Sequence, residues 1–369
     1  MKHLIFDFDG VLGDTLILPK DVYQELHRKL GYGPETYHQN KTNGDHDAEL
    51  IRVSAANNLS LEYGAKPNSE LIAAIFEYQT NHDCRLAIIT NSTRKFVDDV
   101  LNQSNTKLEF DFILSLEDGL VKSEKFNEAA RFWNLDVLDL YYFTDSLNEV
   151  KNYTFLDSSK VFGCTWGGIN TQAQMLEYMP QTRVLNSPNQ LGLILPPNPA
   201  ELVENSDYLQ NLEQWSRLDN RKIVVGAMVI NQAGKVLIQK RSTTRRLFPD
   251  CWDVSAGGHL EIGETIFQAL KRELFEETGL ELDQILGLIQ IYDWKTATND
   301  LQPIQNPLRR EFDFIISCKG DLNIIKIEKE KVSEIRWIGF DELEILQQDQ
   351  TNNNFVYHLI RKSLEHNQN

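Results

Sequence analysis

The chain has 369 residues, of which 41% are hydrophobic and 25% are charged, and its formal net charge is −17. This length exceeds one ordinary hydrophobic core and indicates two domains, and the composition is that of a water-soluble globular protein. The acidic balance disfavours a nucleic-acid-binding surface, because such a surface needs clustered Lys and Arg.

We expect a cytoplasmic protein that does not enter a membrane. The longest apolar run, residues 223–230, is far too short for a bilayer span and indicates a buried strand. The apolar N-terminus runs directly into Asp7 and Asp9, so it has no signal-peptide core. The four cysteines lack paired spacing, which argues against a disulfide scaffold or a structural zinc site.

The first half of the chain alternates apolar strands with helical stretches. Strands are predicted at residues 2–8, 86–90, 110–115, 140–144, 160–166 and 183–186. This alternation predicts a Rossmann-like parallel sheet with helices on both faces, in a domain at 1–195. The helical stretches between the first two strands are too long for a simple crossover. They predict a small helical cap at about residues 16–66.

The pattern breaks at the prolines that follow residue 195, which predicts a linker at 196–220 with one short helix. A second domain is predicted at 221–369. Its first two strands, 223–230 and 235–240, are expected to form a hairpin. The remaining expected elements are strands at 252–256, 285–294, 311–318 and 334–338, and helices at 264–278 and 354–366.

Asp7 and Asp9 follow the first strand in the segment Asp-Phe-Asp-Gly-Val-Leu. Carboxylates at the carboxyl end of a parallel strand lie at the crevice where such folds bind ligands. One Asp can attack phosphorus while the second protonates the leaving oxygen and then activates water. The alternative, that both are solvated loop residues, is opposed by polar residues later in the chain.

Two later segments add groups that can hold a phosphate. Thr90 ends a strand with a hydroxyl, and Asn91 follows it. Lys122 and Lys125 flank the start of a predicted helix, with Ser123 as the expected N-cap. Either ammonium group can neutralise charge on a transferred phosphoryl group. The choice between the two lysines stays open here.

A third segment adds a further carboxylate. Asp145 ends the strand at 140–144, and Glu149 follows four residues later. Mg²⁺ prefers such oxygen-rich surroundings.

At these residues the chain resembles the haloacid-dehalogenase superfamily, over about residues 1–190. The resemblance implies that Asp7 is a nucleophile that forms an aspartyl-phosphate and that Asp9 is the general acid/base. It implies phosphate binding by Thr90, Asn91 and Lys122, and Mg²⁺ ligation by Asp7, Asp9 and Asp145. The chain departs from the family pattern at Glu149, where a second Asp is usual, and in its lysine motif, which lacks the frequent prolines.

The second cluster of carboxylates lies on the helix predicted at 264–278. Glu273 precedes Glu276 and Glu277 by three and four residues, so all three gather on one side of the helix. Carboxylates this close repel one another unless divalent cations bind them. A plain solvated acidic helix is the usual reading of such a charge run. The preceding glycine loop and the spacing argue against that reading here.

Two further features of this helix have predicted roles. Arg272 is placed to orient a glutamate, with Glu264 as its expected partner. Gly279 is a natural helix stop.

These residues match the Nudix signature at every fixed position, and the resemblance covers about residues 221–346. It implies an α/β/α sandwich with a mixed sheet, and hydrolysis of a nucleoside diphosphate linked to another group. It also implies that Mg²⁺ or Mn²⁺ is bound by Gly258, Glu273, Glu276 and Glu277, and that Glu277 acts as a base. Residues 248–253 also resemble isopentenyl-diphosphate isomerase, but the catalytic cysteine of that enzyme is absent from residues 255–258.

The sequence therefore predicts a bifunctional metal-dependent hydrolase. The N-terminal half is expected to be a phosphomonoesterase and the C-terminal half a pyrophosphohydrolase, with Mg²⁺ or Mn²⁺ in both. Its expected partners are small phosphorylated or nucleotide-derived metabolites, not nucleic acids or membranes. The alternatives are that one module is a non-catalytic ligand sensor or regulator, or that the C-terminal half is isomerase-like.

Overall fold

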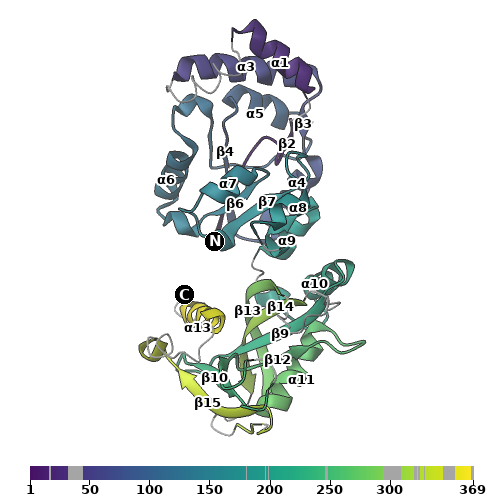
Figure 1. The fold of residues 1–369 in the computed structure, drawn as a ribbon, viewed down its shortest axis with the longest axis vertical. Helices are drawn as coiled ribbons and strands as arrows, with labels where there is room; N and C mark the ends of the chain where they lie inside the picture. The colour runs from purple at the N-terminus through teal and green to yellow at the C-terminus, as the bar shows by residue number, and fades with distance from the viewer. Residues whose placement is uncertain are drawn as a thin grey trace, which may run out of the picture. The chain divides into compact units, whose positions relative to one another are not determined.

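The computed structural model describes residues 1–15, 18–31, 45–179, 181–195, 197, 199–245, 248–294, 309–319, 322, 325–327, 329–343 and 354–366. The chain divides into two compact units, Met1–Gly192 and Leu193–Asn369 (Figure 1). Within the described ranges, no helix has the length and apolar character that crossing a bilayer requires.

A six-stranded sheet with the order β5-β4-β1-β6-β7-β8 forms the centre of the first unit. Every neighbouring pair in it is parallel, which confirms the predicted parallel sheet. The strands are nearly continuous apolar runs, as expected of a sheet that is covered on both faces. Their bounds are β1 (Lys2–Phe6), β4 (Cys84–Ile89), β5 (Phe112–Leu114), β6 (Tyr141–Thr144), β7 (Val161–Cys164) and β8 (Val184–Leu185).

The helices of this unit bury their apolar stripes toward the sheet. Phe126 and Ala129 of one such helix, for example, lie in one hydrophobic cluster with Ile5 and Ala87 of the strands. The helices are α4 (Ser69–Asn81), α5 (Arg94–Leu101), α6 (Lys122–Trp133), α7 (Leu147–Asn152), α8 (Gln172–Leu176) and α9 (Leu191–Ile194), the last reaching the start of the second unit.

The predicted N-cap of α6 is wrong. The helix begins at Lys122, one residue before Ser123, with Val121 as the N-cap. The backbone N–H of Val121 donates to the Glu124 carboxylate at 3.1 Å, so this N–H has a partner at the start of the helix.

Two helices of the predicted cap, α1 (Lys20–Lys29) and α3 (His46–Glu62), lie away from the sheet beyond α5 (Figure 1). Arg52 of α3 donates to the Tyr23 hydroxyl of α1 at 3.2 Å, which joins the two helices. The short antiparallel strands β2 (Gly13–Asp14) and β3 (Lys66–Pro67) connect this layer to the sheet. Residues 16–17 and 32–44 of the predicted cap lie outside the described residues, and its limits stay a prediction.

The second unit contains two sheets with the orders β12-β9-β14-β13 and β11-β10-β15. The larger sheet is mixed, because β9 and β14 are parallel whereas its other pairs are antiparallel. The helices and strands of the second unit are α10 (Asp207–Leu218), β9 (Lys222–Val229), β10 (Val236–Arg241), β11 (Trp252–Asp253), β12 (Ala256–His259), α11 (Ile266–Thr278), β13 (Glu281–Trp294), β14 (Arg309–Lys319), β15 (Val332–Ile338) and α13 (Asn354–His366).

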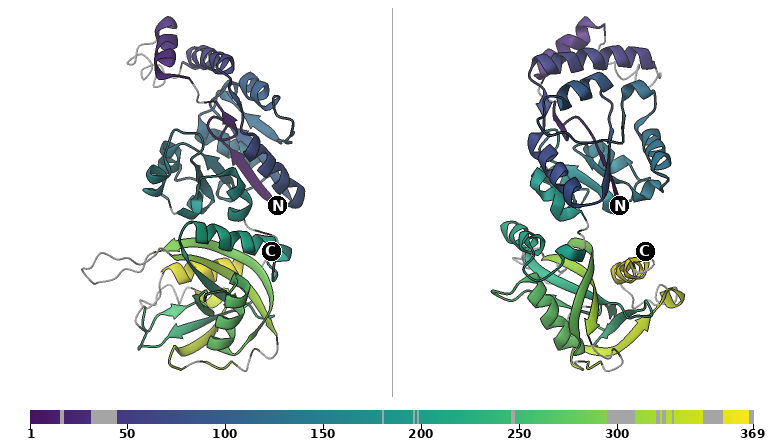
Figure 2. Two further views of the ribbon diagram at one scale, coloured as in Figure 1. Left: turned by 90° about the vertical axis from the view of Figure 1, so that its right-hand side faces the viewer. Right: turned by 180° about the vertical axis from the view of Figure 1, so that it is seen from behind.

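Helices cover both faces of the larger sheet. Val225 and Ala227 of β9 lie in one hydrophobic cluster with α11, whereas Met228 of β9 lies in a second cluster with α13. Residues of alternating parity along a strand point to opposite faces, so α11 and α13 lie on opposite sides (Figure 2). The predicted α/β/α arrangement with a mixed sheet is confirmed.

The predicted hairpin between β9 and β10 is wrong. The turn at residues 231–234 is present, but the strands pair only at the single bridge Ile230–Val236 and enter different sheets. The Ser255 hydroxyl lies between them: it accepts from the Val229 N–H at 2.8 Å and donates to the Leu237 carbonyl at 2.5 Å. This side chain replaces the backbone bonds of a hairpin and allows the strands to diverge.

The residues predicted as a linker, 196–220, contribute a helix to the second unit. Leu209 and Leu212 of α10 are buried in the cluster that includes α11. At the end of α10, Trp215 lies under the guanidinium of Arg310, whose centre is 3.7 Å from the indole centroid. α10 is thus an integral part of the second core.

Arg310 is fully buried and anchors α10 to the sheet. It bonds Asp219, directly after α10, at 2.8 Å and Asp293 of β13 at 2.9 Å. Removal of one partner of a buried ion pair leaves uncompensated charge, which costs more than an exposed pair contributes.

We expect Arg310→Met to destabilise the second unit by about 3–5 kcal/mol, because two carboxylates lose their buried partner. Lys319→Met is the matched control, since Lys319 is an exposed cation at the end of the same strand. Urea unfolding, monitored in each unit by hydrogen exchange, measures the change in the free energy of unfolding. Equal stability of the two variants would contradict the anchoring role.

Candidate active sites

In the first unit, three adjacent strands bring polar groups to one edge of the sheet. Asp7 follows β1, Thr90 follows β4 and Asp145 follows β6, and these strands neighbour one another. Asp7 and Asp145 are only 7% and 3% exposed. The loops approach closely: a Cβ at Gly167 would lie 2.6 Å from Asp145 Oδ2, so only glycine fits there. Asp7 and Asp145 thus follow neighbouring strands at the carboxyl edge of the sheet, as predicted.

The structure distinguishes the two candidate lysines. The ammonium group of Lys122 lies 2.6 Å from Asp7 Oδ2 and 2.6 Å from Glu149 Oε1. Lys125 is fully buried and donates instead to the backbone carbonyls of Thr90 and Ser115, at 2.6 and 2.5 Å. Lys122 is thus the lysine at the carboxylates, and Lys125 holds the loop after β4 in place.

Glu149 contacts protein donors with both of its oxygens. Besides Lys122, its carboxylate accepts from the hydroxyls of Tyr142 at 2.5 Å, Thr144 at 2.7 Å and Tyr153 at 3.3 Å. Lys122 and these hydrogen bonds hold the pKa of Glu149 below its usual value, although burial opposes them. The longer arm of Glu149, relative to an Asp, therefore positions Lys122.

The second aspartate is held by residues that the motifs did not reveal. Asp9 accepts from the Thr15 hydroxyl at 2.7 Å and from the Ser92 hydroxyl at 2.6 Å. Asn57 of α3 donates to Thr93 at 3.1 Å, and its side-chain oxygen lies 3.5 Å from Ser92 Oγ. The cap helix therefore reaches the loop that orients Asp9, a contact across 35 residues of sequence that no local pattern encodes.

The two residues predicted to bind phosphate after β4 differ in burial. Thr90 is fully buried, and its hydroxyl accepts from the Ser92 N–H at 2.9 Å. Asn91 is exposed.

Burial of these acids changes their ionisation. Burial, opposed by Lys122, raises the pKa of Asp7 to about 7. Burial, with the nearby charges of Asp7 and Asp9, raises the pKa of Asp145 to about 8. Asp145 Oδ2 is buried without a hydrogen-bond partner. An unpartnered buried carboxylate oxygen beside other carboxylates suits a hard cation, so Asp7, Asp9 and Asp145 fit Mg²⁺. Among the described residues, however, no three His, Cys, Asp or Glu side chains are already arranged around a metal position.

Without Mg²⁺, we expect the first unit to lose stability as the pH rises from 5 to 8.5. The folded protein holds protons on Asp7 and Asp145 that the unfolded chain releases at lower pH, so their stabilising contribution disappears as the pH passes the folded pKa values of about 7 and 8. The loss should be on the order of several kcal/mol. Urea unfolding in a chelator measures it.

The matched variants Asp145→Asn and Glu128→Gln sharpen this pH experiment, because Glu128 is a partly exposed carboxylate of the same unit. Asp145→Asn should flatten the pH dependence, and Glu128→Gln should leave it unchanged. Added Mg²⁺ should restore stability at pH 8.5 in the unsubstituted protein. A stability that rises with pH in the chelator would contradict the assignment.

In the second unit, α11 carries its carboxylates as predicted. Thr265 caps its start, and Gly279 ends it with a positive φ of 71°, a conformation that glycine adopts without strain. Arg272 donates to both oxygens of Glu264, each at 2.9 Å, which confirms the predicted pair. Arg272 also contacts Glu273 at 2.7 Å and the His259 carbonyl at 2.9 Å, so it fastens the helix to the loop before it.

The three predicted metal-binding glutamates differ in their surroundings. Glu273 lies against the loop: a Cβ at Gly258 would collide with its carboxylate, so Gly258 must lack a side chain. Glu277 is 4% exposed and accepts from Gln239 at 2.9 Å and from the Gly257 N–H at 3.2 Å. Burial raises the pKa of Glu277 despite these bonds. Glu276 is half exposed.

Oxygen donors thus converge where α11 meets the loop at Gly258. Glu273, Glu277 and the adjoining backbone are the hard donor set that Mg²⁺ or Mn²⁺ prefers, so they fit such a cation. Gln239, which holds Glu277, was missed by sequence reasoning, since nothing marks a glutamine in the middle of a strand.

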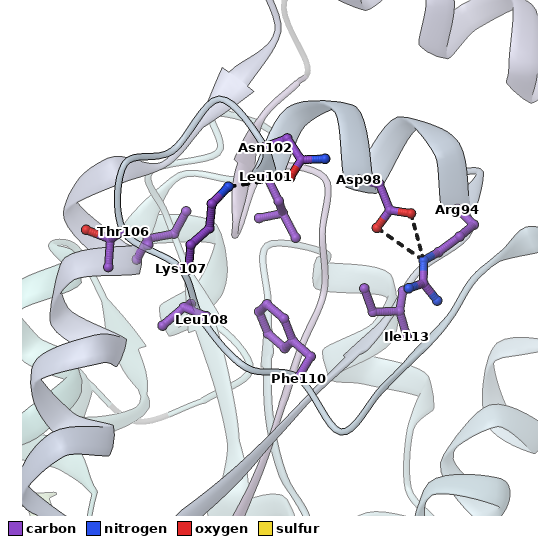
Figure 3. A pocket seen from close by; sticks show the side chains of 10 residues that line it. Arg94, Asp98, Leu101, Asn102, Thr106, Lys107, Leu108, Phe110 and Ile113 are labelled. Carbon is purple, nitrogen blue, oxygen red and sulfur yellow. Dashed lines mark hydrogen bonds and ion pairs between the residues drawn. The ribbon is translucent and has the colours of Figure 1, made fainter.

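A cavity of about 240 Å³ in the first unit lies apart from these groups (Figure 3). Leu101, Phe110 and Ile113 line it, together with Arg94 and Asp98, which form an ion pair at 3.1 Å. None of the predicted site residues lines this cavity.

Comparison with known families assigns a domain to each unit. The model of haloacid dehalogenase-like hydrolases matches residues 4–152, and the model of the NUDIX domain matches residues 220–359. The chain therefore joins a haloacid dehalogenase-like hydrolase domain to a Nudix domain.

Known relatives match parts of the chain. An uncharacterized Nudix hydrolase of Nostoc sp. is 38% identical over 105 residues, which are 26% of this chain and 62% of that protein. An isopentenyl-diphosphate Delta-isomerase of Cutibacterium acnes is 26% identical over 33% of this chain and 62% of its own length. A solved structure assigned as a β-phosphoglucomutase, from Thermotoga maritima, covers 52% of this chain and 96% of its own, at 18% identity and a TM-score of 0.35. The chain thus spans less than two thirds of the first two of these proteins.

Proposed function

We propose that the protein is a bifunctional, metal-dependent hydrolase with one active site in each unit. The observation that carries this proposal is the burial of two separate carboxylate clusters, at Asp7 and Asp145 and at Glu273 and Glu277, each on a domain of a hydrolase family. Buried carboxylates are unfavourable unless a cation compensates them, so both clusters favour a divalent ion.

In the haloacid dehalogenase-like domain, we assign phosphomonoester hydrolysis. Asp7 is the nucleophile that attacks phosphorus and forms an aspartyl-phosphate, while Asp9 protonates the leaving oxygen. Asp9 then takes a proton from the water that attacks the aspartyl-phosphate, which releases phosphate and restores the Asp7 carboxylate. Ser92 and Thr15 hold Asp9 in position for both proton transfers. Asp7, Asp9 and Asp145 would hold Mg²⁺, which would supply positive charge for the phosphoryl oxygens.

Lys122 has a second role in this step. Burial opposes its charge, but the carboxylates of Asp7 and Glu149 outweigh burial and raise the pKa of Lys122, which keeps it protonated. Its ammonium group therefore stays available to a phosphate that reaches Asp7, with Thr90 and Asn91 as further phosphate-binding residues.

In the Nudix domain, we assign cleavage of a diphosphate that links a nucleoside to a second group. Glu273, Glu276, Glu277 and the Gly258 carbonyl would hold a divalent ion, which would supply positive charge for the diphosphate. Glu277 is the proposed base, because burial raises its pKa toward the range in which a carboxylate accepts a proton from water. Arg272 keeps Glu273 and the loop in a fixed geometry.

Two alternatives explain fewer of the observations. A ligand sensor would not need the complete set of glutamates and their buried geometry. An isomerase-like activity is favoured by the relative from Cutibacterium acnes, but residues 255–258 contain no cysteine, and Cys251 is only partly buried outside that segment.

Single substitutions should separate the two activities. We expect Asp7→Asn to lower phosphate release from monoesters about 10³-fold or more without affecting diphosphate cleavage, since it removes the nucleophile of one unit. Glu277→Gln should lower diphosphate cleavage about 10²–10⁴-fold without affecting phosphate release from monoesters. A panel of sugar phosphates, nucleotide sugars and dinucleotides with Mg²⁺, scored separately for released phosphate and monophosphate, measures both.

Matched controls for these variants are Asp99→Asn and Glu281→Gln, which change exposed or partly exposed carboxylates of the same units. Both controls should keep both activities. If either active-site variant keeps its activity, or if both variants lose the same activity, the assignment of one active site to each unit fails.

A further inference from the structure

A second cavity, of about 600 Å³, lies in the second unit. It is bounded by the end of α10, the start of β9, the loop after β12 and the start of β14. Four cationic residues line it, Arg217, Arg221, Lys222 and Arg309, against one carboxylate, Glu261. The glutamates of α11 do not line it, although His259 and Leu260, which follow Gly258 of the proposed Nudix metal site, do.

The charge of this cavity is opposite to that of the whole protein. The chain carries 54 acidic and 37 basic residues, yet basic residues predominate on the wall of the cavity. An anion that binds among cationic groups relieves the repulsion between them. The arrangement therefore suits an anionic ligand.

Arg221 provides a second, independent observation. Its side chain is 9% exposed, and its nearest carboxylate, Asp293, lies 3.8 Å away and is already bonded to Arg310. Arg221 Nε and Nη1 are buried without a hydrogen-bond partner. Within the described part of the chain, the charge of Arg221 is thus compensated only by this long contact, and a guanidinium group matches the oxygens of a phosphate group.

The opposite wall of the cavity is held in place by a hydrogen bond. Arg309 Nε donates to His259 Nε2 at 2.9 Å, which joins the start of β14 to the end of β12. On the α10 side, the stacking of Arg310 on Trp215 fixes the helix end that carries Arg217. Both sides of the cavity are therefore built on fixed elements, which lowers the entropic cost of binding.

We propose that this cavity is a metal-independent binding site for a phosphate or diphosphate monoester. The guanidinium and ammonium groups bind the phosphate oxygens, and Ile223 and Leu260, which also line the cavity, contact the organic part of the ligand. No divalent ion is needed, because the side chains supply the positive charge that the carboxylate clusters lack. The site adds an anion-binding function to that of the proposed active sites.

The test is calorimetric titration of the full-length protein with inorganic pyrophosphate in excess EDTA, which removes metal-dependent binding at the two carboxylate clusters. We expect one saturable site whose affinity falls as salt increases. Arg221→Gln should weaken it about tenfold or more, which corresponds to about 1.4 kcal/mol per factor of ten. The double variant Arg217→Gln/Lys222→Gln should weaken it and reduce the salt dependence, and its exposed positions spare the fold.

Arg336→Gln is the matched control, since Arg336 is a partly exposed cation of the same unit outside the cavity. It should bind pyrophosphate as the unsubstituted protein does. Absence of binding in EDTA overturns the proposal, and so does equal binding by the double variant and the control. Neither result bears on the metal-dependent hydrolysis proposed above, because both are obtained without metal.

Discussion

Both units of this chain hold carboxylates closer together than their charges favour, and in each a single cationic side chain holds the group. Lys122 lies between Asp7 and Glu149, and Arg272 joins Glu264 to Glu273. These contacts span long distances in the chain or fasten a helix to a loop. The carboxylates can therefore be buried in a defined geometry before any metal ion binds.

The same constraint leaves part of the negative charge uncompensated. Asp145 keeps a buried oxygen without a partner, and burial raises the pKa values of Asp145 and Glu277. Charge compensation by the protein is thus incomplete at the positions where a cation and an anionic substrate are proposed to meet. In the cavity beside α10 the balance of charge has the opposite sign, because cationic residues predominate on its wall.

Much of the fold could be predicted from the sequence because its elements carry strong local patterns. Apolar runs that end in Asp7 and Asp145 predicted strands β1 and β6, and the glutamate spacing with Gly279 predicted α11. The failures involve contacts that no local pattern encodes. The Ser255 hydroxyl between β9 and β10 prevents a hairpin that the turn residues favour.

The candidate sites show the same division. Their carboxylates stand in recognisable motifs, whereas the residues that orient them do not. Asn57 of the cap helix lies beside the Ser92 hydroxyl that donates to Asp9, and Gln239 of β10 donates to Glu277 of α11. A short helix was predicted within residues 196–220, but its place in the second core was not. Arg310, which secures α10, lies 91 residues from Asp219.

The central claim is that a divalent ion binds at each of the two carboxylate clusters. Anomalous diffraction from crystals grown with Mn²⁺ tests it most directly, because the signal locates the ion without assumptions about activity. We expect one peak within ligand distance of Asp7 and Asp145, and at least one peak between Gly258 and the carboxylates of Glu273 and Glu277. Peaks elsewhere, or none at either cluster at millimolar Mn²⁺, would contradict the account.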